Sequence, residues 1–345
     1  MNDRYAQTVG FVVAGVGLAA TFLDWPAGAP LAAQAATASA VVALAAFAAR
    51  RHGAGTTALD YVAAAGGVGL VLAASASVLS VTGPLPRGPP VALLAGFATV
   101  GAAAAAVAGL DRDAVRAREL ELVVAAVVSV VALVFGSLVG AVVLGFLPAD
   151  PLVTVPANTV ASSAGFAVAG LAFIRWYDGG VDVRWPSRRD WVVAAVGVVA
   201  ILALHYAMVG LVLVFDLPQS SHSLVETARD HPEILPPLVV LSYVAIGPAE
   251  ELLARNGVQK YLYGAYSRRG AVVVGCFVFT AVHLLAYAGG TPGAVLVTLA
   301  RLFVVSLVLG VAYERTDDLF APVVVHGTYD AVQFVLAYLS FTGVV

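Results

Sequence analysis

Apolar residues in this chain come in long runs that short polar stretches separate. A run of roughly 20 apolar residues is long enough for a helix to cross the hydrocarbon core of a bilayer. The pattern predicts about eleven such helices, so the expected fold class is an all-α polytopic membrane protein. We expect the helices near residues 5–23, 29–49, 60–82, 89–110, 120–147, 152–175, 191–215, 234–255, 270–288, 293–313 and 319–343.

Composition supports this class. Of the 345 residues, 61% are hydrophobic and 11% are charged, whereas about 25% of the residues in a soluble domain are charged. With the N-terminus in the cytoplasm, most of the basic residues fall on the cytoplasmic side, so we expect the N-terminus in and the C-terminus out. The single cysteine, Cys276, excludes an internal disulfide, and we expect it to be a small buried core residue.

The polar stretch from Asp178 to Asp190 is the best candidate for a domain boundary. Residues 1–180 are rich in Ala, Val and Gly, which favours close helix packing, and we interpret them as a transmembrane scaffold of unknown role. Residues 185–345 carry the candidate chemistry. The loop before the eighth helix holds His222 and His231, which we interpret as solvated loop residues in preference to metal ligands.

Ionisable side chains inside the apolar segments gather almost wholly in the C-terminal part of the chain. Each such charge costs about 2.5–3.5 kcal/mol on insertion scales, so a cluster of them indicates a function. Carboxylates and imidazoles together indicate proton chemistry or metal binding. The cluster consists of Glu250, Glu251, Arg255, His283, Arg301, His326 and Asp330.

The first motif ends the predicted eighth helix. Glu251 and Arg255 are four residues apart and share a helix face, so we expect them to pair. Glu250 points about 100° away and is free to face a cavity. Pro248 lacks an N–H and is expected to open the backbone of the preceding turn.

The other two motifs lie on later helices. His283 follows Phe279 by one turn, and the predicted boundaries place His283 nearer the outer leaflet than Glu250. His326 and Asp330 share a face. Asp330 could accept from a ring N–H of His326 and fix its tautomer, or both could point into a shared pocket.

These groups suit hydrolysis, with a carboxylate base that activates water and an imidazole that holds the water or a metal. If Zn²⁺ is the cofactor, the expected ligands are Glu250, His283 and His326. The sequence contains no HExxH, GxGD or GxSxG motif, so three other designs of intramembrane protease are set aside. The residues alone leave open whether a metal takes part.

Three motifs in order on separate apolar helices resemble the CPBP family of intramembrane proteases. That family includes the type II CAAX prenyl endopeptidases and the bacteriocin-processing or immunity (Abi) proteins. The resemblance covers roughly residues 185–345 and rests on Glu250-Glu251-x3-Arg255, Phe279-x3-His283 and His326-x3-Asp330.

The resemblance implies a role for each motif. Glu250 would activate water with His283, Glu251 and Arg255 would form the supporting ion pair, and the third motif would form a second pair, often described as an oxyanion site. Several family members carry Asn where this chain has Asp330. An ionised Asp cannot donate to an oxyanion, so Asp330 must be protonated, orient the neighbouring imidazole or bind a metal.

The expected function is an intramembrane endopeptidase that acts on a membrane-associated or prenylated, CAAX-like peptide. Two alternatives stay open: a proton-coupled secondary transporter, since chains of acids also mark such carriers, and a non-catalytic immunity or binding scaffold. We expect the lipid bilayer and a peptide or protein substrate as partners, and no nucleic acid. An excess of Arg over Lys is typical of GC-rich prokaryotes, so we expect a multi-pass protein of a prokaryotic cell membrane.

Overall fold

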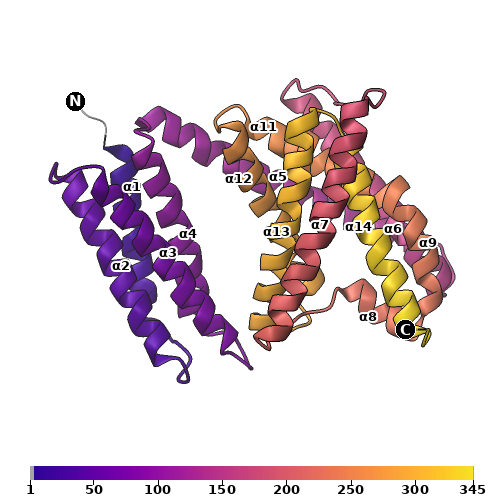
Figure 1. Ribbon diagram of the computed structural model, residues 1–345, viewed down its shortest axis with the longest axis horizontal. Helices are drawn as coiled ribbons and strands as arrows, with labels where there is room; N and C mark the ends of the chain where they lie inside the picture. The colour runs from indigo at the N-terminus through magenta and orange to yellow at the C-terminus, as the bar shows by residue number, and fades with distance from the viewer. Residues whose placement is uncertain (1–3, 345) are drawn as a thin grey trace. The chain divides into compact units, whose positions relative to one another are not determined.

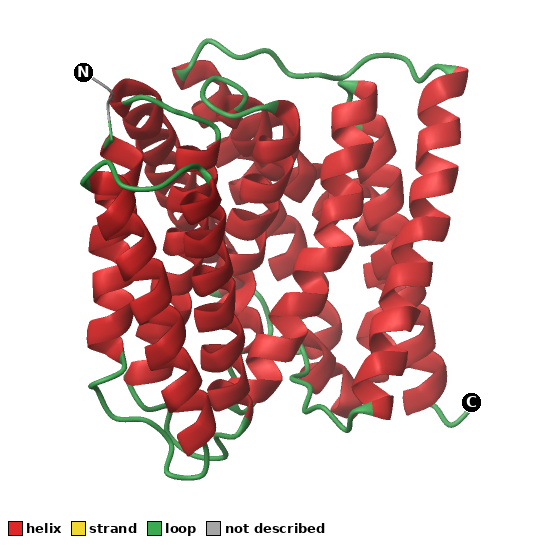
Figure 2. Cartoon of the chain, turned by 60° about the vertical axis from the view of Figure 1, so that its left-hand side comes forward, coloured by secondary structure: helices red, strands yellow, loops and turns green. Residues whose placement is uncertain are grey.

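A computed structural model describes residues 4–344, and every regular element within them is a helix (Figures 1 and 2). Ten of these helices are long and apolar enough to cross a membrane. A further apolar helix, α1 (Tyr5–Ala20), has 16 residues and is about 24 Å long, shorter than a hydrocarbon core of about 30 Å. The all-α polytopic membrane fold is confirmed, and the orientation of the termini stays a prediction.

The chain divides into two compact units. The first runs to Glu119 and adds Pro218–Ser220 and Gly290–Val297. The second comprises Leu120–Leu217, Ser221–Gly289 and Thr298–Val345. The division by contacts falls before the polar stretch that the sequence favours as a boundary. As a result, two helices of the predicted scaffold share a unit with the candidate chemistry.

The first unit contains α1 and the helices α2 (Pro30–Arg51), α3 (Ala58–Leu79) and α4 (Gly88–Val107). Small residues let these helices approach closely, as expected for packing inside a membrane. A Cβ atom on Gly66 would lie 2.8 Å from the carbonyl oxygen of Ser39. Close backbone contact therefore replaces large side chains in this unit.

The second unit holds the remaining long helices. Helices α7 and α14 lie side by side (Figure 1), where Val325 of α14 packs against Ile201 of α7. The bounds are α5 (Arg112–Leu144), α6 (Pro151–Trp176), α7 (Arg188–Val214), α8 (Ser223–Asp230), α12 (Arg268–Val282), η4 (His283–Tyr287), α13 (Pro292–Thr316) and α14 (Phe320–Phe341). Both α5 and α13 begin in the first unit.

One span of this unit, Pro232–Leu262, is helical throughout but irregular. Its segments are η1 (Pro232–Ile234), α9 (Leu235–Leu241), η2 (Ser242–Ile246), α10 (Gly247–Glu251), η3 (Leu252–Gln259) and α11 (Lys260–Leu262). Both η2 and η3 are π-helical. The first π segment ends at Ile246, two residues before Pro248, whose missing N–H was expected to open the backbone of the preceding turn.

The predicted end of this span near residue 255 is wrong, because the helix continues to Leu262. Polar residues misled the prediction: Asn256 and Gln259 are fully buried, and each has a partner in another segment. The Asn256 amide donates to the Gly180 carbonyl (2.9 Å), and the Gln259 amide donates to the Gly310 carbonyl (3.0 Å). A polar helix turn can therefore stay inside the protein.

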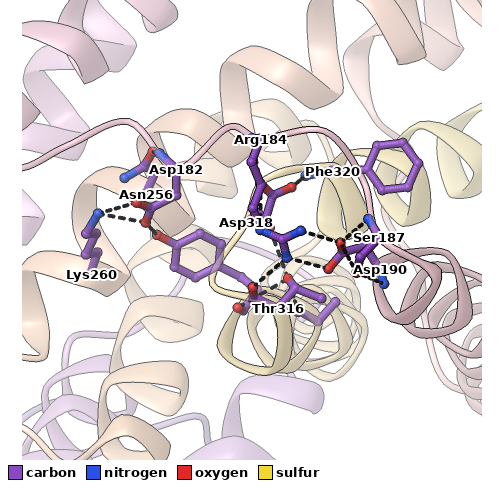
Figure 3. Close-up of polar contacts among 11 residues, drawn as sticks. Asp182, Arg184, Ser187, Asp190, Asn256, Lys260, Thr316, Asp318 and Phe320 are labelled. Carbon is purple, nitrogen blue, oxygen red and sulfur yellow. Dashed lines mark hydrogen bonds and ion pairs between the residues drawn. The ribbon is translucent and has the colours of Figure 1, made fainter.

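The link between α6 and α7 is bound to the rest of the unit by two groups of polar contacts (Figure 3). In the first group, Asp182 accepts from Lys260 Nζ at 2.6 and 2.7 Å and from the Tyr313 hydroxyl. The Asp182 N–H donates to Asn256 Oδ1 (2.7 Å). These contacts attach the link to the end of the irregular span and to α13.

The second group of contacts lies at the N-terminus of α7. Arg184 donates to both oxygens of Asp190 (2.7 and 2.8 Å), and the backbone N–H of Arg184 donates to Asp318 Oδ2 (2.9 Å). Asp190 also accepts from the backbone N–H and the hydroxyl of Ser187, both at 2.6 Å. Ser187 and Asp190 form a capping box, so this carboxylate both caps the helix and holds the link.

Removing this carboxylate should loosen the link. We expect Asp190→Ala to lower the free energy of unfolding by about 1–3 kcal/mol, because the helix loses its capping box and Ser187 loses its partners. Thermal unfolding of the purified protein in detergent measures the effect. Arg189→Ala, at the exposed neighbouring position, is the control and should unfold like the wild type. Equal melting temperatures for all three proteins would contradict this prediction.

Candidate active site

Two adjacent carboxylates lie on α10, the short segment between the two π-helical segments. They differ in exposure: the Glu251 side chain is 0% exposed and the Glu250 side chain is 25% exposed. The helical period explains the difference, since neighbours point about 100° apart. π-Helical insertions occur frequently at functional sites, and here they flank both acids.

Glu251 uses both of its oxygens. Arg255 Nε donates to Oε2 at 2.9 Å, which confirms the predicted pairing. His326 Nδ1 lies 2.7 Å from Oε1. An ionised carboxylate only accepts, so the contact places a proton on Nδ1 and turns Nε2 toward the other acids. Glu251, in place of the Asp330 considered from the sequence, therefore sets the His326 tautomer.

The Arg255 guanidinium is completely buried. It donates to Cys276 Sγ at 3.4 Å and lies 5.1 Å from the centre of the Phe279 ring, a cation–π contact. The Cys276 thiol donates to the Ser306 carbonyl oxygen at 3.2 Å. Cys276 is buried as expected, but it also links the ion pair to α13, which the sequence did not indicate.

His283 is the first residue after α12 and opens the 3₁₀ segment η4. Its Nδ1 lies 2.7 Å from the Phe279 carbonyl oxygen, and its Nε2 lies 3.6 Å from Glu250 Oε2. The expected difference in depth from Glu250 was wrong. The error arose because the eighth helix was predicted to end near residue 255, which put Glu250 close to a helix end. The helix in fact continues to Leu262, about 18 Å beyond Glu250.

The third motif completes the cluster. His326 Nε2 lies 3.5 Å from Asp330 Oδ2 and 4.0 Å from Glu250 Oε2. Each of the six predicted site residues thus lies within 4.0 Å of another, measured between side-chain nitrogen and oxygen atoms. These residues are Glu250, Glu251, Arg255, His283, His326 and Asp330.

The three predicted zinc ligands lie close together, with both imidazoles within 4.0 Å of the Glu250 carboxylate. Glu250, His283 and His326 bring one carboxylate and two imidazoles together, a donor set that zinc accepts. Even so, among residues 4–344 no group of three or more His, Cys, Asp or Glu side chains is placed to hold a metal ion. Zinc at these three residues stays a prediction.

A cavity of about 270 Å³ lies beside Glu250 and His283. Sequence patterns did not indicate two of its walls. One wall is formed by α5 and α6. On α5, Ser129, Leu133 and Ser137 recur every fourth residue and so share a helix face. The other includes His222, which was interpreted as solvated. The further lining residues include Ser162, Phe166, Leu253, Val258, Val278, Phe279, Val282 and Leu285.

The buried ion pair should carry much of the stability of this unit. We expect Arg255→Leu to destabilise the protein by about 3–5 kcal/mol, because it leaves Glu251 buried without its cation. Yield of folded protein and thermal unfolding in detergent measure the loss. Arg315→Leu is the control, since that side chain is 67% exposed, and it should behave like the wild type. Similar stability of the two variants would disprove the structural role of the pair.

Comparison with known proteins agrees with the geometry. Residues 232–332 match the family model of Rce1-like type II CAAX prenyl endopeptidases. The matched segment contains all six predicted site residues, and α5 and α6 lie outside it. No curated protein and no solved structure matches the chain. Over this segment, the chain is similar to Rce1-like type II CAAX prenyl endopeptidases, in agreement with the resemblance that the sequence motifs indicate.

Proposed function

We propose that this protein is an intramembrane endopeptidase that uses Glu250 and His283 to activate water. The observation that carries the proposal is the 3.6 Å separation of Glu250 Oε2 and His283 Nε2 at the edge of the 270 Å³ cavity. The family match supports a protease of the membrane. The mechanism follows from the protons on these two groups.

The two facing atoms are both acceptors. Because His283 Nδ1 donates to the Phe279 carbonyl, the neutral ring has no proton on Nε2. The Glu250 carboxylate has none either, so a direct hydrogen bond between them is absent. A water molecule can bridge two polar atoms that are more than 3.5 Å apart. One water can donate an O–H to each atom, which leaves its lone pairs directed at a bound peptide.

The reaction then needs only one proton acceptor. The water oxygen forms a bond to the carbonyl carbon of the scissile peptide bond as Glu250 takes one water proton. The carbon–nitrogen bond of the tetrahedral intermediate breaks, and the proton on Glu250 passes to the leaving amine. The products are a carboxylic acid and an amine, and Glu250 is ionised again.

The remaining residues position this pair. The buried ion pair of Glu251 and Arg255 holds His326, whose Nε2 faces Glu250 at 4.0 Å and Asp330 at 3.5 Å. We assign the pair of His326 and Asp330 to proton exchange with Glu250. An ionised Asp330 accepts but does not donate, so it suits this role better than binding an oxyanion.

The substrate class follows from the family and from the cavity walls. The matched family is named for prenylated CAAX proteins, and we extend this class to a membrane-associated or prenylated, CAAX-like peptide. Apolar side chains such as Phe166, Val278 and Leu285 line the cavity and favour a hydrophobic chain beside the scissile bond. We place the protein in the cell membrane of a prokaryote.

Removing the base should stop cleavage and leave the fold intact. We expect Glu250→Gln to reduce cleavage by about 10²–10⁴-fold, the usual contribution of general base catalysis. The measurement compares peptide termini in membranes that contain equal amounts of wild type and variant. Glu314→Gln is a matched control, because the Glu314 side chain is 26% exposed against 25% for Glu250. If the Glu250 variant yields the same termini as the wild type, the proposed function fails.

Zinc gives a second test. Zinc held by Glu250, His283 and His326 would supply Lewis-acid activation of water. We expect cleavage by the purified protein to survive EDTA and 1,10-phenanthroline, because the two facing acceptors suffice to polarise water. Mass spectrometry of the protein measures bound zinc in the same samples. Loss of cleavage that added Zn²⁺ restores, together with one zinc per chain, would contradict the metal-free mechanism and assign these three ligands.

A further inference from the structure

His222 is a third histidine beside the candidate base. It is the residue before α8, and its Nδ1 accepts from the Leu224 N–H at 3.1 Å. Its ring meets the Tyr287 ring edge-on, with 5.2 Å between centroids and 87° between planes. The same ring lines the cavity with Glu250 and His283. His222 is therefore fixed in place from two sides and faces the site.

The hydrogen bond at Nδ1 decides where the proton of His222 lies. An imidazole nitrogen that accepts from a backbone N–H carries no proton, so the neutral ring carries its proton on Nε2. Burial lowers the pKa of His222, and His283 acts in the same direction, whereas Glu250 opposes both. The neutral ring with an N–H at Nε2 is thus the form present near neutral pH.

The proposed reaction requires a hydrogen-bond donor such as this N–H. When water attacks a peptide carbonyl, the carbonyl oxygen becomes negative, and fixed N–H or O–H donors stabilise it. When the rings of His283 and His326 are neutral, with the proton on Nδ1, both Nε2 atoms are acceptors. The Ser129 hydroxyl, also in the cavity wall, already donates to the Ala125 carbonyl at 2.8 Å. The site is thus rich in acceptors, and His222 adds a donor.

We propose that His222 donates from Nε2–H to the carbonyl oxygen of the scissile peptide bond as that oxygen becomes an oxyanion. The inference rests on the proteolytic function proposed above. No proton is transferred in this step, since the N–H···O bond shortens and strengthens while the charge develops. His222 lies outside the matched family segment, so the chain would supply this donor from its own loop.

His222→Asn tests the donor separately from the helix cap. Asn is a favoured N-cap residue, so α8 stays capped, but the shorter side chain takes the ring nitrogen out of the cavity. We expect kcat to fall about 10²-fold, the usual cost of one oxyanion donor, with KM and melting temperature unchanged. The assay uses the full chain in lipid vesicles and a fluorescence-quenched, farnesylated CAAX peptide.

His231→Asn is the matched control. It lies in the same loop at the other end of α8, is exposed, and contacts Glu233. This variant should cleave like the wild type. His222→Ser, which also caps a helix, repeats the test should the Asn variant unfold.

The outcomes separate the two proposals. Wild-type cleavage that Glu250→Gln abolishes and His222→Asn leaves unchanged overturns the donor role alone. A rise in KM with kcat intact also overturns it, because an oxyanion donor acts in the transition state. Loss of melting temperature in both His222 variants shows a structural role and overturns it too. Absence of cleavage by the wild type overturns the proposed function and the donor role together.

Discussion

The fully buried Glu251 carboxylate is the constraint on which the rest of the site depends. A charge without a partner in this environment costs several kcal/mol, so the fold must bring partners to both of its oxygens. Arg255 comes from the same span and His326 from α14. Through Cys276 and Ser306 the contacts of Arg255 reach α12 and α13. One buried charge therefore fixes four membrane segments relative to one another.

The backbone of the irregular span presents the other acid. Between two π-helical segments, α10 turns Glu251 inward and leaves Glu250 at the cavity. The span then continues through buried Asn256 and Gln259, whose side chains bond to the loop after α6 and to the carbonyl of Gly310. Because these partners let the helix continue, Glu250 lies well inside the span and at the depth of His283.

Spacing along one helix was enough to predict part of this site. The four-residue separations predicted the pair of Glu251 and Arg255 and the proximity of His326 to Asp330, and both are confirmed. The contact of Glu251 with His326 joins residues 75 positions apart, and helical periodicity holds no information on such contacts.

The fold shows the same limit. Apolar runs located the long helices, because a bilayer imposes a length on them. The end of the irregular span was wrong, because polar residues near a predicted helix end look like an interface with water until their partners are known. His222 was misinterpreted for a related reason: a loop residue becomes part of a site only through the helices that the fold places under it.

The three histidines of the proposed site differ in the partner of Nδ1. For His283 the partner is a carbonyl at the end of α12, for His326 it is a buried carboxylate, and for His222 it is a backbone N–H. In the neutral rings, two of the three Nε2 atoms are therefore acceptors and one is a donor. None of these partners needs to move during the proposed reaction, so the polarity of the site is set before substrate binds. Such preorganisation is the main source of electrostatic stabilisation of a transition state in a site from which water is largely excluded.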